Sequence, residues 1–378
     1  MRIGYDITAI NARPSGVGTY AAALLRHLVE VEPGHEYLLL SNREANPALL
    51  PAAPTVRLAQ RRFPTRALWM QLSLPRRLRA LQPDLCHYPN SLGPLFNPTP
   101  YVVNIFDMTL SLLPRYHTLR SQLLARPLIP LVARRAERVI TLSEHARQDV
   151  IRVLRVAPER VVVGAAAAAP MFRPVDPAEH ARVRARYGLD RPYVLYVGTL
   201  EPRKNLVRLI QAWDWLRERG EIQHQLALVG GRGWRDQAIF EAARAVGRPD
   251  DLVFAGYVPR EDLPALYGAA DLFAFPSLSE GFGLPVVEAM ACGTPALVEV
   301  AGDAALAADP LSVLALAEAM ARILNDQGLR ETLRERGRRR AAGYSWRIAA
   351  EQTLDLYRSV LAAGRPLGDA AGDATALS

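Results

Sequence analysis

The chain has 378 residues, half of them hydrophobic and 22% charged, a length and composition typical of two globular domains that exclude a disordered chain. Its two cysteines lie far apart, so we expect neither a disulfide framework nor a thiolate zinc site. No apolar run approaches the ~18 to 20 residues that span a bilayer, so we expect no membrane span and no export signal. Together these expectations favour a cytoplasmic protein. The formal net charge is +8, and its positive excess lies in residues 1–173, which contain 22 arginines and 11 acidic residues. Such a positive region could attract anionic lipid, an acidic acceptor or nucleic acid, and the alternative is a solvated surface with no partner.

Short β-branched and aliphatic runs alternate with longer helical patterns along the chain. Strands are predicted at residues 2–7, 36–41, 84–87, 101–106, 138–142, 193–197, 225–229, 252–254 and 272–275. Helices are predicted at residues 18–31, 119–136, 144–154, 206–219, 285–291, 311–324, 328–341 and 345–361. Because strands that alternate with helices form parallel sheets, the pattern predicts an α/β fold with two doubly wound sheets.

A linker is predicted at residues 164–177, where small residues and three prolines break the alternation. This places the domain boundary near residue 173. We expect domains at 1–173 and 174–344, a terminal helix at 345–363 and a frayed tail at 364–378. Ligands of doubly wound sheets bind outside the carboxyl ends of the strands, so we expect a site in the cleft between the domains.

The first glycine-rich stretch, residues 16–21 (GVGTYA), follows the first predicted strand and opens a helix. This pattern can bind a dinucleotide, but eight residues separate Ile7 from Gly16, and the second strand ends without the acidic residue that would hold a ribose. We favour a loop whose backbone, at Gly16 and Gly18, approaches a phosphate or a sugar, with a plain loop as the alternative.

The second stretch, residues 198–205, follows the strand at 193–197 and contains Arg203 and Lys204. Lys204 is the only lysine among 46 basic residues, which indicates a position that needs a compact positive charge. Cations beside a helix start are unfavourable unless an anion binds there. The pair is therefore predicted to neutralise a diphosphate, with a basic helix start as the alternative.

The third and most specific stretch is residues 276–295, PSLSEGFGLPVVEAMACGTP. Pro285 suits a first helical position and Gly293 a position just past the helix end. Gly281 and Gly283 precede this helix and leave its amide groups accessible to an anion. Glu288 lies one turn into the helix, where it can reach ribose hydroxyls, and Glu280 lies on the preceding loop, with a capping role as its alternative.

The pair Glu280 and Glu288, separated by seven residues, resembles the E-x7-E signature of the retaining, nucleotide-sugar-dependent glycosyltransferases of family 4, which have the GT-B fold. Other matching stretches are residues 16–20, 87–89, 107, 143–145, 197–205, 228–234, 256–258 and 302–306. The resemblance implies two Rossmann-like domains facing a central cleft. It also implies an N-terminal acceptor-binding domain, a C-terminal nucleotide-sugar-binding domain and a terminal helix that crosses back to the first domain.

The resemblance also implies roles for individual residues. Arg203 and Lys204 would hold the donor diphosphate and Glu280 the transferred hexose, which makes these three the expected catalytic residues, while Glu288 would hold the ribose. The other residues implied in donor binding are Gly16, Gly18, Gly230, Tyr257, Gly281, Phe282, Gly283 and Leu284. Asp107 and His117 are implied on the acceptor side. Enzymes of this kind look metal-independent, and no metal-ligand spacing occurs here, so we expect neither metal nor cofactor.

The chain departs from the family pattern at two places. Phe106 precedes Asp107 where the family commonly has a histidine, so a role for an imidazole is absent there. Only residues 296–298 lie between Pro295 and Glu299, roughly seven fewer than in the family by that resemblance. Three extended residues cover only ~10 Å, so the short connection predicts that a strand and its return loop do not both fit.

The arginine-rich stretch from Arg61 to Ala80 contains six arginines among aromatic and aliphatic residues. It suits a basic amphipathic helix on an anionic membrane. Because the fold needs a helix packed on its sheet before the strand at 84–87, we favour the structural interpretation.

The sequence therefore predicts a retaining glycosyltransferase that moves a hexose from a nucleoside diphosphate sugar to a glycan or lipid-linked acceptor in polysaccharide or cell-envelope synthesis. The resemblance of residues 197–205 to mannosyltransferases implies mannose as the hexose. The anionic inner face of a membrane is a further candidate partner. We do not expect the protein to bind nucleic acid. The alternatives are a catalytically silent glycosyltransferase-like scaffold, which the short connection favours, and an NAD-dependent oxidoreductase.

Overall fold

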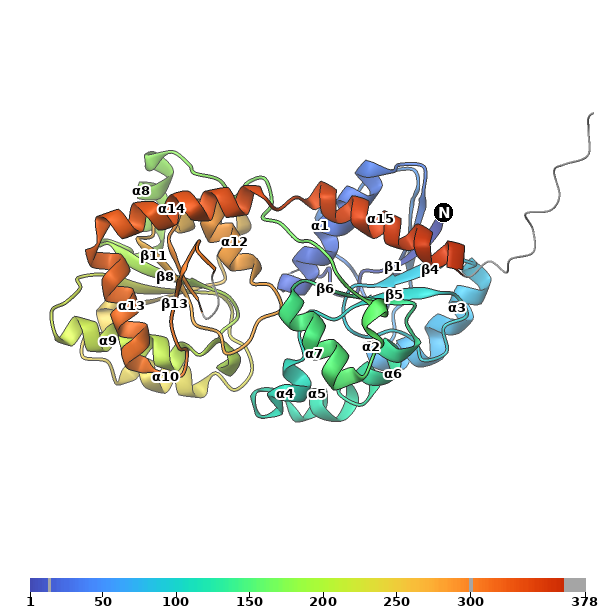
Figure 1. The fold of residues 1–378 in the computed structure, drawn as a ribbon, viewed down its shortest axis with the longest axis horizontal. Coiled ribbons are helices and arrows are strands. Elements are labelled where there is room, and N and C mark those ends of the chain that lie inside the picture. Colours follow the sequence, from blue (N-terminus) through green and yellow to red (C-terminus); the bar gives the residue numbers. More distant parts are fainter. Residues whose placement is uncertain (13–14, 299–301, 364–378) are drawn as a thin grey trace, which may run out of the picture. The chain divides into compact units, whose positions relative to one another are not determined.

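A computed structural model describes residues 1–12, 15–298 and 302–363 (Figure 1). The chain divides into two compact units: residues 1–113, 119–165 and 346 onward form the first, and residues 114–118 and 166–345 form the second. The boundary lies after Ala165 and not near residue 173, because Phe172 is buried in the core of the second unit. The expected tail at 364–378 lies outside the described residues.

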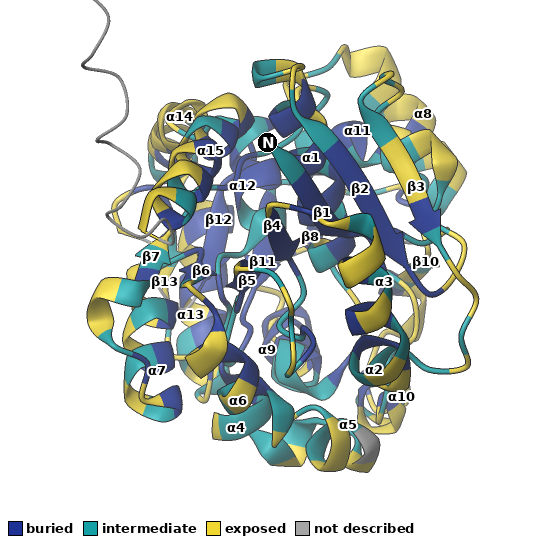
Figure 2. Ribbon diagram, turned by 90° about the vertical axis from the view of Figure 1, so that its right-hand side faces the viewer, coloured by how far each residue is buried: buried dark blue, intermediate teal, exposed yellow. Residues whose placement is uncertain are grey.

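The first unit is built on a seven-stranded parallel sheet with the order β3-β2-β1-β4-β5-β6-β7. Its strands are β1 (Arg2–Asp6), β2 (Glu36–Ser41), β3 (Val56–Gln60), β4 (Leu85–Tyr88), β5 (Tyr101–Asn104), β6 (Arg138–Thr141) and β7 (Val161–Val163). The central strands β1 and β2 are buried, whereas the edge strand β3 is partly exposed (Figure 2). This matches the apolar runs of β1 and β2, since parallel strands are covered on both faces.

The helices of the first unit are α1 (Gly16–Val31), α2 (Arg66–Leu68), α3 (Leu74–Leu81), α4 (Thr109–Leu112), α5 (Leu119–Leu124), α6 (Leu128–Arg135), α7 (Glu144–Leu154) and α15 (Trp346–Ala363). Short 3-10 turns occur at Pro47–Leu49 and Pro158–Arg160 and a π-helical turn at Trp69–Ser73. The helix predicted at 119–136 is two helices, because Pro127 lacks the amide hydrogen that a continuous helix requires. The terminal helix α15 belongs to this unit and packs against α1 (Figure 1).

The arginine-rich stretch at 61–80 forms α2, the π-helical turn and α3. Trp69, Met70, Leu74 and Leu78 from this stretch are fully buried in the core. The favoured structural interpretation of the stretch is therefore confirmed. Leu68 and Leu72, one helical turn apart, are 50% and 56% exposed.

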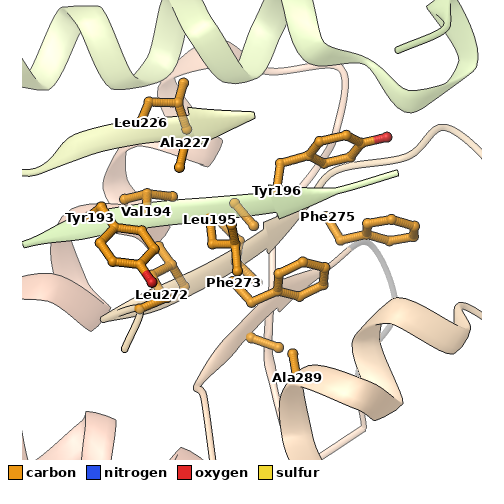
Figure 3. Packing of buried hydrophobic residues seen from close by; sticks show 14 of the residues in the cluster. Tyr193, Val194, Leu195, Tyr196, Leu226, Ala227, Leu272, Phe273, Phe275 and Ala289 are labelled. Carbon is orange, nitrogen blue, oxygen red and sulfur yellow. The ribbon is translucent and has the colours of Figure 1, made fainter. Parts of the chain in front are cut away.

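The second unit contains a six-stranded parallel sheet with the order β10-β9-β8-β11-β12-β13. Its strands are β8 (Tyr193–Val197), β9 (Gln225–Val229), β10 (Leu252–Gly256), β11 (Leu272–Phe275), β12 (Ala296–Val298) and β13 (Leu306–Ala307). The core packs aromatic and aliphatic side chains of β8, β9 and β11 together with Ala289 (Figure 3).

Its helices are α8 (Pro177–Tyr187), α9 (Leu206–Glu218), α10 (Gln237–Arg244), α11 (Leu263–Gly268), α12 (Leu284–Ala291), α13 (Val313–Asn325) and α14 (Gln327–Ala342). Short 3-10 turns occur at Pro114–Tyr116, Pro202–Lys204, Pro249–Asp251 and Arg260–Asp262. The order of both sheets reverses at one point, next to β1 in the first unit and next to β8 in the second, so both units are doubly wound as predicted.

The short connection after Pro295 contains a three-residue strand, so the strand itself is present, and the return loop that was predicted not to fit beside it lies partly outside the described residues. Ala296 pairs with Phe273 and Val298 with Phe275 of β11, while β13 pairs with the other side of β12. Three residues are enough because β11 itself has only four. Glu299 lies outside the described residues, and residues 302–305 form turns and bends before β13.

Candidate active site

The candidate site lies at the carboxyl edge of the second sheet, where β8 has β9 on one side and β11 on the other. The chain leaves these two strands in opposite directions along the sheet, and such a reversal point leaves room for a ligand above the strand ends. The segment after β8 carries Arg203 and Lys204, and the segment after β11 carries Glu280. The sequence-predicted catalytic residues therefore come from neighbouring strands.

A close backbone approach shapes the base of this site. A Cβ atom added at Gly230 would lie 1.9 Å from the carbonyl oxygen of Gly198, so no other residue fits at position 230. The Gly230 amide donates to the carbonyl of Gly256, at 2.8 Å, which ties the turn after β9 to the end of β10. Gly230 is one of the residues predicted to bind the donor. The structure gives another reason for a glycine at this position, because the turns after β8 and β9 pack too closely for a side chain.

Asn205 joins the two segments that carry the charged residues. Asn205 has a left-handed backbone conformation, with a φ of +61°. It follows the 3-10 turn that ends at Lys204 and directly precedes the first residue of α9. Its buried side-chain amide donates to the carbonyl oxygens of Pro276, at 3.1 Å, and Pro310, at 2.6 Å. The Leu278 amide also donates to the Arg203 carbonyl, at 3.0 Å. These hydrogen bonds hold Arg203 and Lys204 against the segment that contains Glu280.

Two cations and two carboxylates meet in this site. The ammonium of Lys204 forms an ion pair with Oε1 of Glu280, and Nη1 of Arg203 lies 3.1 Å from the same oxygen. Nη2 of Arg203 donates to Oε1 of Glu201 at 2.9 Å, and its Nη1 donates to the Ser279 carbonyl at 2.7 Å. The Lys204 ammonium also lies 4.9 Å from the centre of the Phe275 ring, a favourable cation–π distance.

Burial and charge shift the two carboxyl groups in opposite directions. Burial by itself raises the pKa of Glu280, but the charges of Lys204 and Arg203 outweigh it and hold this pKa below its ordinary value. The pKa of Glu201 is raised, because its burial outweighs the effect of Arg203 and Lys204. Glu280 is therefore the carboxylate of the pair that is held firmly in its charged form.

The helix α12 begins directly after the Glu280 segment. Gly283 caps it with a φ of +81°, and Pro285 occupies the second helical position, where a missing amide hydrogen costs nothing. Gly293, with a φ of +83°, follows its end, as the sequence predicts. Phe282 is half-buried beside the ring of Tyr344, with ring centres 5.4 Å apart, and Leu284 opens the helix.

Glu288 is buried in α12, and its side chain is held from α11. The hydroxyl of Tyr267 donates to Oε2 of Glu288 at 3.2 Å. Burial raises the pKa of Glu288 to about 7, while Arg260 and the Tyr267 hydrogen bond act in the lowering direction. A carboxyl group that titrates near neutral pH can accept hydrogen bonds from a diol in its charged form.

Comparisons with known proteins identify the family. A family model described as Glycosyltransferase Family 4 matches residues 14–164, and one described as Glycosyl transferases group 1 matches residues 179–340. The chain belongs to the family 4 glycosyltransferases. The resemblance drawn from Glu280 and Glu288 is confirmed, and the alternative of an NAD-dependent oxidoreductase is wrong.

This glycosyltransferase is 38% identical over 231 residues to O-antigen chain mannosyltransferase B of Escherichia coli, a match that covers 59% of this chain. The same match covers 61% of the length of that protein. Sucrose-phosphate synthase from Thermosynechococcus elongatus shares the fold, with a TM-score of 0.76 at 23% identity over 96% of this chain and 100% of that one. So does Anabaena HepE in complex with UDP and glucose, with a TM-score of 0.75 at 19% identity over 95% and 100% of the two chains. The predicted GT-B fold is confirmed.

The other predicted residues of this glycosyltransferase lie at several places. Tyr257 is 52% exposed in the loop after β10, next to Gly256, and Gly281 is buried before α12. His117 belongs to the second unit, where its ring stacks on Trp234 with centres 6.1 Å apart. Gly16 and Gly18 lie in the first turn of α1, and Asp107 accepts a 2.9 Å hydrogen bond from the Thr109 amide, all in the first unit.

Three functional residues were missed by sequence reasoning: Glu201, which orients Arg203, Asn205, which joins the two segments, and Tyr267, which holds Glu288. A glutamate directly before a Pro-Arg-Lys run at a strand end is the signal that could have identified Glu201. Asn205 stands directly before a helical pattern, which was equally visible. Tyr267 lies in a separate helix, and nothing in the sequence connects it with Glu288.

Within the described part of the chain, no group of three or more His, Cys, Asp or Glu side chains is placed to hold a metal ion. Among the same residues, no helix is both long and apolar enough to cross a membrane.

Proposed function

We propose that the protein transfers a hexose from a nucleoside diphosphate sugar to a glycan or lipid-linked acceptor in cell-envelope polysaccharide synthesis, with retention of the anomeric configuration. The observation that carries this proposal is the pairing of Lys204 and Arg203 with Glu280 at the carboxyl edge of the second sheet. The two cations suit a diphosphate, and Glu280 and Glu288 suit sugar hydroxyls.

In the proposed reaction, the bond between the anomeric carbon and the diphosphate oxygen breaks while Lys204 and Arg203 stabilise the charge on the leaving diphosphate. The acceptor hydroxyl attacks the anomeric carbon from the same face. Its proton passes to the departing diphosphate oxygen, so the products are the glycosylated acceptor and the nucleoside diphosphate. The protein supplies charge and alignment, and we propose that it needs no metal ion.

The donor is proposed to carry mannose, on the support of the 38% identical mannosyltransferase. The structural relative that holds UDP and glucose keeps a glucose donor as the competing choice. Binding calorimetry with GDP, UDP, dTDP and ADP would identify the base, and a transfer assay with the matching nucleotide sugars would identify the hexose. Failure of all four nucleotides to bind would contradict the proposal.

A silent scaffold was the alternative to an enzyme. It rested on the short connection after Pro295, and β12 and β13 on either side of that connection are both paired in the sheet. The ion pairs of Lys204, Arg203 and Glu280 also favour a working site.

We further propose that the first unit binds an anionic membrane surface, on the cytoplasmic side. Arg61, Arg76 and Arg77 line a hollow of about 490 Å³ together with Phe63, Leu72 and Ser73. Among the described residues, these three arginines have no carboxylate within 4.0 Å. Exposed Leu68 and Leu72 lie on the same helical face as Arg76, and leucines beside arginines suit a lipid surface better than nucleic acid.

Cosedimentation with phosphatidylglycerol vesicles tests this surface. We expect binding that weakens as salt is raised, because screening shortens to about 8 Å at physiological ionic strength. Arg76→Glu combined with Arg77→Glu should weaken binding, whereas Arg26→Glu combined with Arg155→Glu, at exposed positions of the first unit, serves as the charge-matched control. Equal binding by both variants would contradict the proposed surface.

A further inference from the structure

The cations of the candidate active site are neutralised by the protein's own carboxylates. Lys204 pairs with Glu280, and Arg203 lies between Glu280, at 3.1 Å, and Glu201, at 2.9 Å. Two positive charges therefore face two carboxylates, and the side chains of both cations are 13% exposed or less. A diphosphate that approached this arrangement would meet little net positive charge.

The two carboxylates differ in how firmly they are held. The side chain of Glu201 is 4% exposed and lies directly before the 3-10 turn that contains Arg203. The side chain of Glu280 is 24% exposed and lies in residues 276–283, which contain no helix or strand. Gly281 follows Glu280 directly, and the backbone next to a glycine in an irregular segment can change conformation more easily than backbone that leads into a 3-10 turn. Of the two carboxylates, Glu280 is the one that can leave the cations.

We propose that Glu280 and the donor diphosphate are alternative partners of Lys204 and Arg203, so that binding of the diphosphate displaces the Glu280 carboxylate. The inference rests on the proposed function and deepens it. The displaced carboxylate is then available to the hydroxyl groups of the hexose. A diphosphate without a sugar breaks the same ion pairs and gains no such contact, so the site discriminates against the product and favours the donor.

Removal of the Glu280 charge should strengthen the binding of a bare diphosphate, because the carboxylate then no longer competes for Lys204 and Arg203. Inorganic pyrophosphate is the probe, since it needs no knowledge of the base or the hexose. We expect Glu280→Gln to bind pyrophosphate about tenfold more tightly than the unmodified protein, given the strength of charged hydrogen bonds that no longer compete. Turnover with the nucleotide sugar should fall in the same variant.

Calorimetry on the full chain tests the exchange with four proteins: unmodified, Glu280→Gln, Lys204→Gln and the double variant. In the Lys204→Gln background, Glu280→Gln should change pyrophosphate affinity by less than about threefold, because its main partner is gone. Glu241→Gln, an exposed position in α10, is the control for loss of one negative charge. Melting temperatures confirm that each variant is folded.

The outcomes separate the two ideas. Pyrophosphate that binds the unmodified protein and Glu280→Gln equally, or binds the variant more weakly, overturns the exchange while the proposed function stands. An equal gain in Glu241→Gln also overturns it, because the effect would then be one of net charge. Absence of pyrophosphate binding in every variant overturns the diphosphate site itself, and the proposed function with it.

Discussion

The hydroxyl of Tyr357, in the terminal helix α15, lies 2.5 Å from Nδ1 of His87, in strand β4. The other ring nitrogen of His87 lies 2.5 Å from Oδ1 of Asn104, whose amide nitrogen donates to Tyr20 at 3.2 Å. A neutral ring satisfies both contacts, since Nε2–H donates to Asn104 and Nδ1 accepts from Tyr357. The network therefore ties α15 to the first sheet by hydrogen bonds that are completely buried.

Burial lowers the pKa of His87 to about 4. Because the unfolded chain binds the proton more tightly, the free energy of unfolding rises with pH between about 4 and 6.5. As pH falls through this range, the protein loses about 3 kcal/mol of stability. We expect His87→Gln to flatten this dependence. Urea unfolding at pH 5 and 7, followed in both proteins, measures it. The same pH slope in both proteins would contradict the assignment.

Glu288 should show the opposite pH dependence. Burial raises its folded pKa to about 7, so its contribution to stability is complete below about pH 4.5 and is lost as pH rises to 7. Glu288→Gln keeps a neutral side chain at every pH, so we expect it to be more stable than the unmodified protein at pH 8. Nucleotide affinity should fall in the same variant. The same loss of stability between pH 5 and pH 8 in Glu288→Gln and in the unmodified protein would show that Glu288 does not titrate in this way.

Lys204→Ala should lower kcat/KM for the nucleotide sugar by at least about tenfold, which corresponds to about 1.4 kcal/mol of transition-state stabilisation. Its melting temperature should change little, because Arg203 lies 3.1 Å from Glu280 and still pairs with the carboxylate that Lys204 leaves. Arg219→Ala, at the exposed end of α9, is the matched control and should keep full activity. Unchanged kinetics in Lys204→Ala would remove this residue from the catalytic site.

Chelation should leave turnover unchanged. Arg203 and Lys204 are proposed to supply the charge that a metal ion supplies in other transferases, so activity measured with excess EDTA should equal activity without it. Restoration of lost activity by Mg²⁺ or Mn²⁺ after chelation would contradict this prediction.

An insertion of seven residues after Leu297 should lower the melting temperature. The insertion would interrupt β12, which pairs with β11 on one side and β13 on the other. The same insertion in the exposed turn around Gly220 is the control, because a Cβ there would meet nothing within 4 Å. A rise in melting temperature and nucleotide affinity would mean that the short connection is a defect after all.

Local patterns were sufficient for the elements that position the site. The strand at 193–197 and the strand at 272–275 are found with the predicted bounds, because each is a short apolar run ended by a clear turn. The three-residue strand at 296–298 could not be predicted in the same way, since its identity depends on pairing with distant residues on both sides.

The chemistry of the site was predictable only in part. The charged residues Arg203, Lys204 and Glu280 could be singled out because their residue types and positions relative to strands carry a chemical meaning. Their partners could not be, because the hydrogen bond from Asn205 to Pro310 spans 105 residues and no local pattern reports it. The pKa of Glu288 likewise depends on burial between α11 and α12, a property of packing.

The lone lysine of these 378 residues provides a chemical handle on the site. An amine-reactive label has one ε-amino group to find in this chain, and that group is the partner of Glu280. Acylation at this position would report directly on whether the ammonium is engaged. The other 45 positive side chains are all guanidinium groups, so Lys204 and the α-amino group of Met1 are the two amines that such a label meets in this sequence. Peptide mapping separates the two adducts, and the Lys204 adduct then reports occupancy without an engineered cysteine or a radioactive donor.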